Sequence, residues 1–166
     1  MNNKLNLLFV VLLCISVIIG CNTQESINES KNNVFEEQNN DNNQIPTVCA
    51  KDACFNVELA KTGAEQSKGL MNRENMAQDV GMLFVFNDVG TYSFWMKNTL
   101  ISLDMIWVDE NYKIVDIYEN AKPCGNEKCL PIIPIKKSKY VLEINGGLSK
   151  INNIKIDDLL EFKNIK

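Results

Sequence analysis

Residues 81–90 read Gly81-Met82-Leu83-Phe84-Val85-Phe86-Asn87-Asp88-Val89-Gly90. The first six residues form a continuous apolar run of strand length, and the last four are typical of a turn, so the segment predicts a central β-strand. Residues 55–59 alternate between apolar and polar side chains, as expected for a strand that buries one face. These two stretches predict a domain built mainly from β-strands.

Further strands are expected at short intervals on both sides of this run. The candidates are residues 92–97, 103–108, 113–118, 140–144 and 159–162. Thr62 and Glu65 have the spacing of a capping box, which predicts one short helix over residues 64–71. Three prolines between residues 120 and 139 predict a loop. The sequence thus indicates a mainly β (β-rich α+β) domain, a compact antiparallel sandwich or barrel with one short helix.

The N-terminus has the build of an export signal. Lys4 supplies a positive charge, residues 7–19 are almost wholly apolar, and Ile18-Ile19-Gly20-Cys21 resembles a bacterial lipobox. The apolar run is shorter than the roughly 20 residues that a membrane-spanning helix needs. We expect residues 1–20 to be a lipoprotein signal peptide and acyl chains on Cys21 to hold an extracytoplasmic protein on the cell membrane. An ordinary cleaved signal and an uncleaved anchor are the alternatives.

The rest of the chain divides into two parts. Residues 21–45 are rich in Asn, Gln, Glu and Ser and contain few apolar side chains, so we expect a disordered tether. Residues 46–166 form a single expected β domain. The chain has no histidine, which excludes imidazole catalysis and histidine metal ligands. Its net charge of -4 and the lack of a basic block argue against nucleic acid as a partner.

Four cysteines lie in the expected domain, and they form two pairs with four intervening residues, Cys49 with Cys54 and Cys124 with Cys129. An even number suits an oxidising compartment. We favour two local disulfides, since a turn brings residues five apart within disulfide reach. A tetrathiolate zinc site and a redox-active dithiol are alternatives, but both more often use two intervening residues. No metal site or cofactor is therefore expected.

Five separated motifs resemble one protein family. They are Gly69-Leu70-Met71-Asn72-Arg73, residues 81–86, Phe94-Trp95-Met96-Lys97-Asn98-Thr99, Leu103-Asp104 and Tyr140-Val141-Leu142-Glu143. Together they are similar to domain-of-unknown-function family 192 (DUF192), over about residues 54–162. The resemblance implies a small β-rich fold with a short helix, and it implies no activity. Ser102 departs from the family pattern, which commonly has proline before the leucine-aspartate pair.

Polar and aromatic residues of these motifs are the candidate site. A tryptophan beside polar side chains is typical of a surface that binds a sugar, a peptide or another polar ligand. The candidates for such a cluster are Arg73, Trp95, Lys97, Asn98, Thr99, Asp104 and Glu143. The structural alternative is that Asn98 and Thr99 satisfy backbone groups in a turn, that Asp104 pairs with Arg73 or Lys97, and that Trp95 packs in the core.

These observations predict a non-catalytic binding or envelope-accessory module with a small polar ligand, a glycan or an envelope protein as its partner. The first alternative is an enzyme acting on an envelope component through Arg73, Lys97, Asn98, Asp104 and Glu143. The second is a Cu(I)-binding module, since thioether sulfur is a soft ligand. Its candidate ligands are Met71, Met76, Met82, Met96 and Met105.

Overall fold

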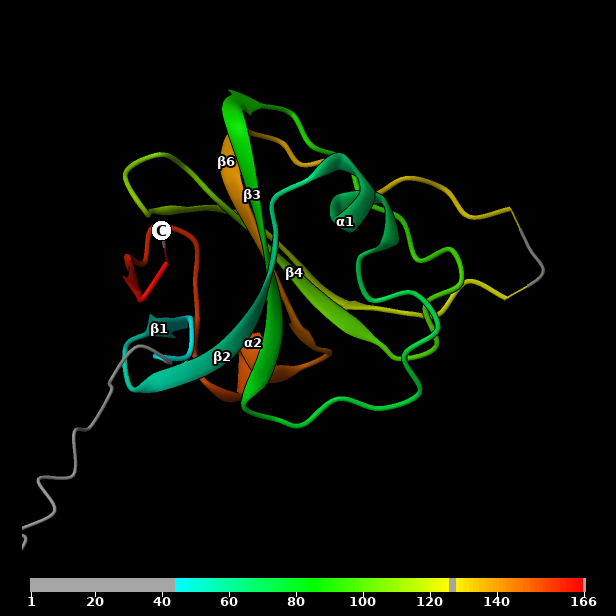
Figure 1. Ribbon diagram of the computed structural model, residues 1–166, viewed down its shortest axis with the longest axis horizontal. Helices are drawn as coiled ribbons and strands as arrows, with labels where there is room; N and C mark the ends of the chain where they lie inside the picture. Colours follow the sequence, from blue (N-terminus) through cyan, green and yellow to red (C-terminus); the bar gives the residue numbers. More distant parts are fainter. Residues whose placement is uncertain (1–43, 126–127, 166) are drawn as a thin grey trace, which may run out of the picture. The chain divides into compact units, whose positions relative to one another are not determined.

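One curled sheet organises residues 44–125 and 128–165, which are the residues described by the computed structural model (Figure 1). Its strands in that part of the chain are β1 (Thr47–Ala50), β2 (Ala53–Ala60), β3 (Val80–Gly90), β4 (Leu103–Val108), β5 (Ile114–Ala121), β6 (Ser138–Asn145) and β7 (Leu160–Lys163). They lie in the order β5-β4-β6-β3-β2-β1-β7. Two short helices, α1 (Gly63–Lys68) and α2 (Leu148–Ile151), complete the fold. The expected mainly β class is confirmed as a half-barrel.

The sheet differs from the expected antiparallel arrangement at one pair. β2 and β3 run parallel, whereas the other paired strands run antiparallel. The chain makes this crossover through residues 61–79, which include α1 and are long enough to return to the start of a parallel strand. A second helix, α2, accompanies the single helix that the sequence predicted.

The strand expected at residues 92–97 is absent. Phe94 forms an isolated bridge with Ile132, and Lys97 forms another with Cys124. The alternating pattern there has a different cause, since Met96 is buried and Phe94 half-buried between exposed neighbours on a loop. The predicted hairpin of β4 and β5 and the strands at β2, β3, β6 and β7 are confirmed.

Apolar side chains fill both faces of the curled sheet. The inner core includes Leu83, Ile106 and Leu142, and its open side approaches closure where Lys113 bridges to Leu159. The outer core includes Phe84 and Trp107, and it lies on the face covered by α1 and the loops. Because strand side chains alternate between faces, neighbouring residues of one strand enter different cores.

The two local disulfides are confirmed. Cys49 is bonded to Cys54 across the β1–β2 hairpin, and Cys124 is bonded to Cys129 in the loop after β5. Such bonds persist in oxidising compartments and indicate a non-cytoplasmic protein. None of the helices in the described part has the length and apolar character that crossing a membrane requires. The predicted signal peptide, Cys21 and most of the predicted tether lie outside the described residues.

Candidate functional site

Helix α1 is fixed over the outer face of the sheet by its two ends. The Thr62 hydroxyl accepts the Glu65 amide at 3.3 Å, and the Glu65 carboxylate accepts the Thr62 amide at 2.8 Å, which confirms the capping box. The Gln66 side-chain amide donates to the Val85 carbonyl at 2.9 Å and so ties α1 to β3. Gly69 ends the helix with φ 45°, close above the Phe84 ring.

Two loops lie next to each other beyond the end of α1. The Asn72 amide donates to the Asn98 carbonyl at 2.7 Å, and both asparagines adopt the left-handed backbone conformation that this residue tolerates. Phe94 exchanges two backbone hydrogen bonds with Ile132, which fixes the second loop from its other side. The loops therefore form two walls beside α1, with the sheet beneath them.

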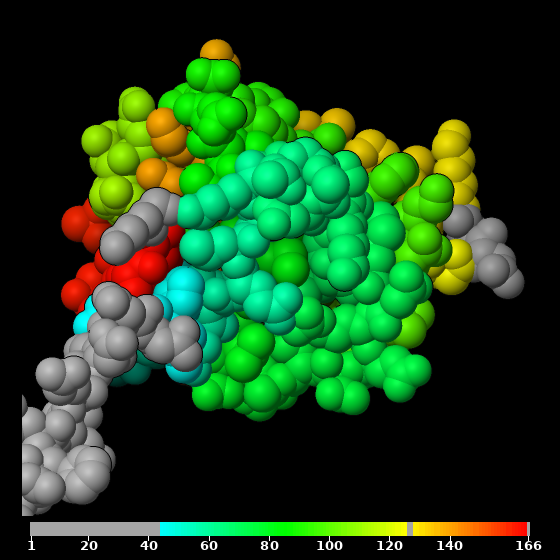
Figure 2. All heavy atoms as spheres, viewed as in Figure 1, coloured from blue at the N-terminus to red at the C-terminus, as the bar shows by residue number. Residues whose placement is uncertain are grey.

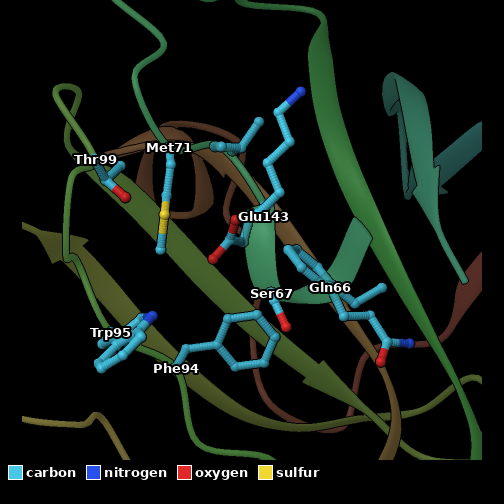
Figure 3. Close-up of a pocket in the computed structure, with 11 residues that line it drawn as sticks. Gln66, Ser67, Met71, Phe94, Trp95, Thr99 and Glu143 are labelled. Carbon is cyan, nitrogen blue, oxygen red and sulfur yellow. The ribbon is translucent and has the colours of Figure 1, made fainter. Parts of the chain in front are cut away.

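Between these walls a small cavity of about 30 Å³ reaches down to Glu143 on β6. Its roof comes from the end of α1 and the residues after it, and its wall comes from the second loop. The lining includes Gln66, Ser67, Met71, Phe94, Trp95 and Thr99. In Figure 3 the Glu143 carboxyl group lies among these side chains and points into the space between Met71 and Phe94. The cavity has room for a group of the size of one or two water molecules.

The Glu143 carboxyl group is buried without a partner. The residue is 4% exposed, and no described residue forms a hydrogen bond or an ion pair with its carboxyl group. Burial alone disfavours the charged form and raises the pKa of Glu143 to about 8. At pH 7 the group is therefore mainly a neutral acid, which donates one hydrogen bond and accepts others. A buried acid with a raised pKa at the base of a pocket is characteristic of a functional site.

Two larger grooves adjoin the cavity on either side of α1. One, of about 470 Å³, runs past Phe86, Tyr92 and Trp95, and the other, of about 390 Å³, runs past Glu58 and Arg73. Figure 2 shows the surface hollowed between α1 and β2, with atoms of β3 visible at the base. A ligand can thus place a small polar group at Glu143 while its body lies in a groove.

Trp95 stands at the mouth of the cavity. Its side chain is 49% exposed, so the alternative that Trp95 packs in the core is wrong. The Lys97 ammonium lies 5.3 Å from the centre of the indole ring, a cation–π distance. An exposed flat aromatic surface beside a deep polar group is the arrangement that binding sites for sugars and peptides use.

The structure brings together only part of the predicted polar cluster. Trp95, Thr99 and Glu143 line the cavity. The Asn98 carbonyl accepts the Asn72 amide, but the Asn98 side-chain amide lies 4.0 Å from the Met71 sulfur, so among the described residues it does not satisfy a backbone group as the structural alternative required. The Thr99 hydroxyl donates to the Lys97 carbonyl at 3.5 Å, as that alternative held. Arg73 lies in the neighbouring groove.

Asp104 does not belong to this site. It pairs in register with Ile144, whereas Glu143 pairs with Met105, so the two acids point to opposite faces of the sheet. The Asp104 carboxylate accepts backbone amides from Asn120, Gly147 and Ser149 at 2.7 to 2.8 Å.

The ion pair expected for Asp104 is therefore wrong. Arg73 pairs with Glu58 at 2.7 Å, and Lys97 stacks on Trp95. Backbone donors that converge on a fully buried carboxylate satisfy Asp104 without a cation.

Sequence reasoning missed the contribution of α1 to the cavity. The capping box predicted the helix, but a six-residue helix without a buried residue gives no apolar stripe that would show which face meets the sheet. Gln66 and Ser67 were for this reason not candidates. Phe94 was quoted in a motif, and its half-buried position on the cavity wall depends on its bridge to Ile132.

The methionines and acids give little support for a metal. Met82, Met96 and Met105 are buried in the outer core, where methionine fills gaps, while Met71 and Met76 are half-buried. Among the described residues, no three Asp, Glu or Cys side chains come close enough to hold a metal ion together. The Cu(I) alternative stays a prediction, with Met71 the member that lines the cavity.

Comparison of the chain with known protein families finds one that matches residues 46–162, which is nearly the whole described part. The chain belongs to the DUF192 family. This family is described as uncharacterized ACR. Several solved structures are similar, among them the following two, and no curated protein matches. One is a candidate transcription regulator of Sinorhizobium meliloti 1021, 34% identical, with TM-score 0.64, over 70% of this chain and 91% of that chain. The other is a protein of unknown function from Novosphingobium aromaticivorans, 40% identical, with TM-score 0.62, over 70% and 83%.

Proposed function

We propose that this DUF192 protein is a lipid-anchored, extracytoplasmic binding module that captures a glycan of the cell envelope at the Glu143 cavity. The observation that carries the proposal is the buried carboxyl group of Glu143, which has no partner in the described chain and faces a cavity beside the exposed ring of Trp95. A group without a protein partner at such a place is available to a ligand.

The size and chemistry of the cavity favour a neutral polar group as the part that enters. Room for one or two water molecules admits a hydroxyl or an amide but not a sugar ring. A neutral acid can donate to and accept from such a group at once. The ring of the sugar would lie against Trp95, where the apolar face of a sugar and the face of an indole are complementary.

A non-catalytic role is supported by the surroundings of Glu143. Asp104 faces the other side of the sheet, so it cannot serve as a second carboxylate. The Ser67 hydroxyl donates to the Gly63 carbonyl at 2.7 Å and is engaged in the helix backbone. An acid without an oriented base or nucleophile can bind a ligand but completes no acid-base pair.

The second candidate function is an enzyme that uses Glu143 as a proton donor. The raised pKa of Glu143 favours it, because a general acid must be protonated at the working pH. Glu143→Gln separates the two functions. Glutamine also donates and accepts, so a binding module keeps its affinity, whereas an enzyme keeps affinity and loses turnover.

Titration with N-acetylglucosamine oligosaccharides tests the proposal. The chain has two tryptophans, and Trp107 is buried and donates to the Tyr92 carbonyl at 2.8 Å, so a change in fluorescence reports on Trp95. Calorimetry should show that Glu143→Leu weakens binding at least about tenfold, since the leucine leaves the ligand group unpaired. Glu143→Gln should bind as the wild type does, and it should keep binding above pH 8, where the ionised wild-type group no longer donates.

Glu161→Leu is the matched control, because Glu161 lies on β7, is exposed, and lines neither the cavity nor the two adjoining grooves. It should leave the affinity unchanged. Binding that survives Glu143→Leu would exclude the cavity as the site. Loss of binding in Glu143→Gln would show instead that the site needs a carboxylate anion, and hence a cationic ligand.

A further inference from the structure

An apolar segment beside the second disulfide is exposed to a degree that the fold does not require. Leu130, Ile133 and Ile135 are 68, 64 and 88% exposed, three aliphatic side chains within six residues. In Figure 1 this segment, drawn in yellow to orange, lies on the side of the domain away from β1. Clustered aliphatic exposure of this kind marks a contact surface.

Most backbone positions of the segment have no unpaired amide hydrogen, which favours contact with an apolar phase. Pro131 and Pro134 have no amide hydrogen. The Ile132 amide donates to the Phe94 carbonyl at 2.7 Å, and the Ile135 amide donates to the Asp116 carboxylate at 2.7 Å. Four of the six residues from 130 to 135 therefore have no amide hydrogen that would lose a hydrogen bond to water. This lowers the free-energy cost of moving the segment into an apolar phase.

Lysines flank the apolar side chains. Lys128 precedes them, Lys136 and Lys137 follow them directly, and all three are exposed. The whole chain carries a net charge of -4, so this basic character is local. The nearby Asp116 has both carboxylate oxygens engaged, one by the Ile135 amide and the other by the Ile117 amide at 2.9 Å. Aliphatic side chains flanked by lysines complement an apolar layer below an anionic surface.

We propose that residues 128–137 form a membrane-contact segment for an anionic bilayer. Leu130, Ile133 and Ile135 enter the boundary between headgroups and acyl chains, and the lysines contact the headgroup phosphates. The membrane would be near because of the lipid anchor, so this choice of partner rests on the proposed function. Residues 22–43 could span at most about 80 Å, more than the roughly 35 Å width of a domain of this size, so the anchor allows the segment to face the membrane.

Vesicle sedimentation of the mature chain without its lipid, residues 22–166, tests the segment separately from the anchor. The chain should bind phosphatidylcholine vesicles that contain about 30% phosphatidylglycerol more tightly than vesicles of phosphatidylcholine alone. Ile133→Ser combined with Ile135→Ser should weaken binding at least about tenfold. Lys136→Gln and Lys137→Gln should each weaken it about fivefold, and only on the anionic vesicles.

Ile151→Ser and Leu159→Ser are the matched controls, because these side chains are 76 and 67% exposed and lie elsewhere in the chain. Both should bind vesicles as the wild type does, and all variants should keep the wild-type melting temperature, since every altered side chain is exposed. No binding to either kind of vesicle, or equal losses in the control variants, would overturn the proposal. Self-association that depends on Ile133 and Ile135, without vesicle binding, would assign the segment to a protein partner and would overturn it as well.

Discussion

At the scale of single residues, the protonation of Glu143 couples the cavity to the stability of the fold. Between pH 4.5 and about 8 the carboxyl group is ionised in the unfolded chain and protonated in the folded chain. Folding takes up a proton in this window, so the free energy of unfolding falls as the pH rises through it. Glu143→Gln should remove this slope, and its free energy of unfolding should exceed that of the wild type at pH 8 by on the order of 4 kcal/mol. Urea unfolding between about pH 5 and pH 8 measures both effects.

The other groups with shifted pKa values do not titrate between pH 4.5 and 8, so they do not interfere with that measurement. The chain has no histidine, the pKa values of Glu65, Asp157 and Asp158 are lowered, and those of Tyr92, Lys113 and Tyr140 are raised. Glu58→Gln, which removes an exposed carboxylate, should leave the slope in place. A slope that persists in Glu143→Gln would show that this carboxyl group is already ionised in the folded protein.

Asp104 is the second acid whose burial has a measurable consequence. Its carboxylate holds the bulged end of β5 through the Asn120 amide and the start of α2 through the Gly147 and Ser149 amides. Asp104→Asn keeps the shape but turns one acceptor into a donor that faces an amide. We expect it to lower the free energy of unfolding by about 2–4 kcal/mol in chemical denaturation.

Asp109→Asn is a comparison for Asp104. The Asp109 carboxylate also accepts two amides, from Asn111 and Lys113, but it does so in the turn between β4 and β5, where water can replace it. Its loss should be below about 1 kcal/mol. Equal losses for the two aspartates would contradict the assignment of Asp104 as a buried organiser of the sheet.

The sequence could identify the residues of the site better than their grouping. Glu143 and Trp95 were candidates because they are polar and aromatic residues of the motifs that resemble the DUF192 family. Which face each acid occupies depends on the register between β4 and β6, since a shift of one residue would move Asp104 to the side of Glu143. No local pattern fixes that register. The contribution of Gln66 was hidden for the same reason, because the place of α1 depends on its contact with β3.

At the scale of elements, the disulfide between Cys49 and Cys54 secures the edge of the sheet. β1 has four residues, and β7 pairs within the sheet with β1 alone. Replacing both cysteines by alanine should lower the free energy of unfolding by about 2 kcal/mol. Hydrogen exchange should accelerate at the β7 amides more than at β6 in the sheet centre. The matched variant, in which alanine replaces Cys124 and Cys129, should leave the β7 amides protected from hydrogen exchange. Loss of their protection in this variant would contradict the assignment of the Cys49–Cys54 disulfide as the bond that secures the edge of the sheet.

Element predictions succeeded where burial and pattern agree. The apolar run of β3 and the alternation of β2 each specify a strand directly. β1 was missed because four residues are too few to establish a period, and α2 because its N-cap Gly147 supplies no capping side chain. Residues 92–97, in contrast, were predicted to be a strand and form a loop. Their alternation was real, but side-chain burial on a loop produced it without a neighbouring strand.

At the scale of the whole molecule, two attachments to the membrane would differ in strength. The proposed acyl chains on Cys21 would hold through apolar burial and would resist salt, whereas the proposed segment at residues 128–137 would depend in part on lysines and would weaken as salt screens them. The Glu143 cavity, with its wall at residues 94–99 bridged to that segment, would then open close to the membrane surface. An envelope glycan near the membrane would be within its reach.

Cell fractionation of a Cys21→Ala variant separates these two attachments. The wild type should stay in the membrane fraction through a wash with about 1 M salt, where the screening length is only about 3 Å, and should need detergent for release. The variant should sediment in part at low salt and leave the membrane in the salt wash, because only the peripheral segment remains. Adding Ile133→Ser and Ile135→Ser should free it even at low salt. A Cys21→Ala protein that withstands the wash would show that residues 1–20 stay attached as an anchor, since neither acyl chains nor lysine contacts could then explain its retention.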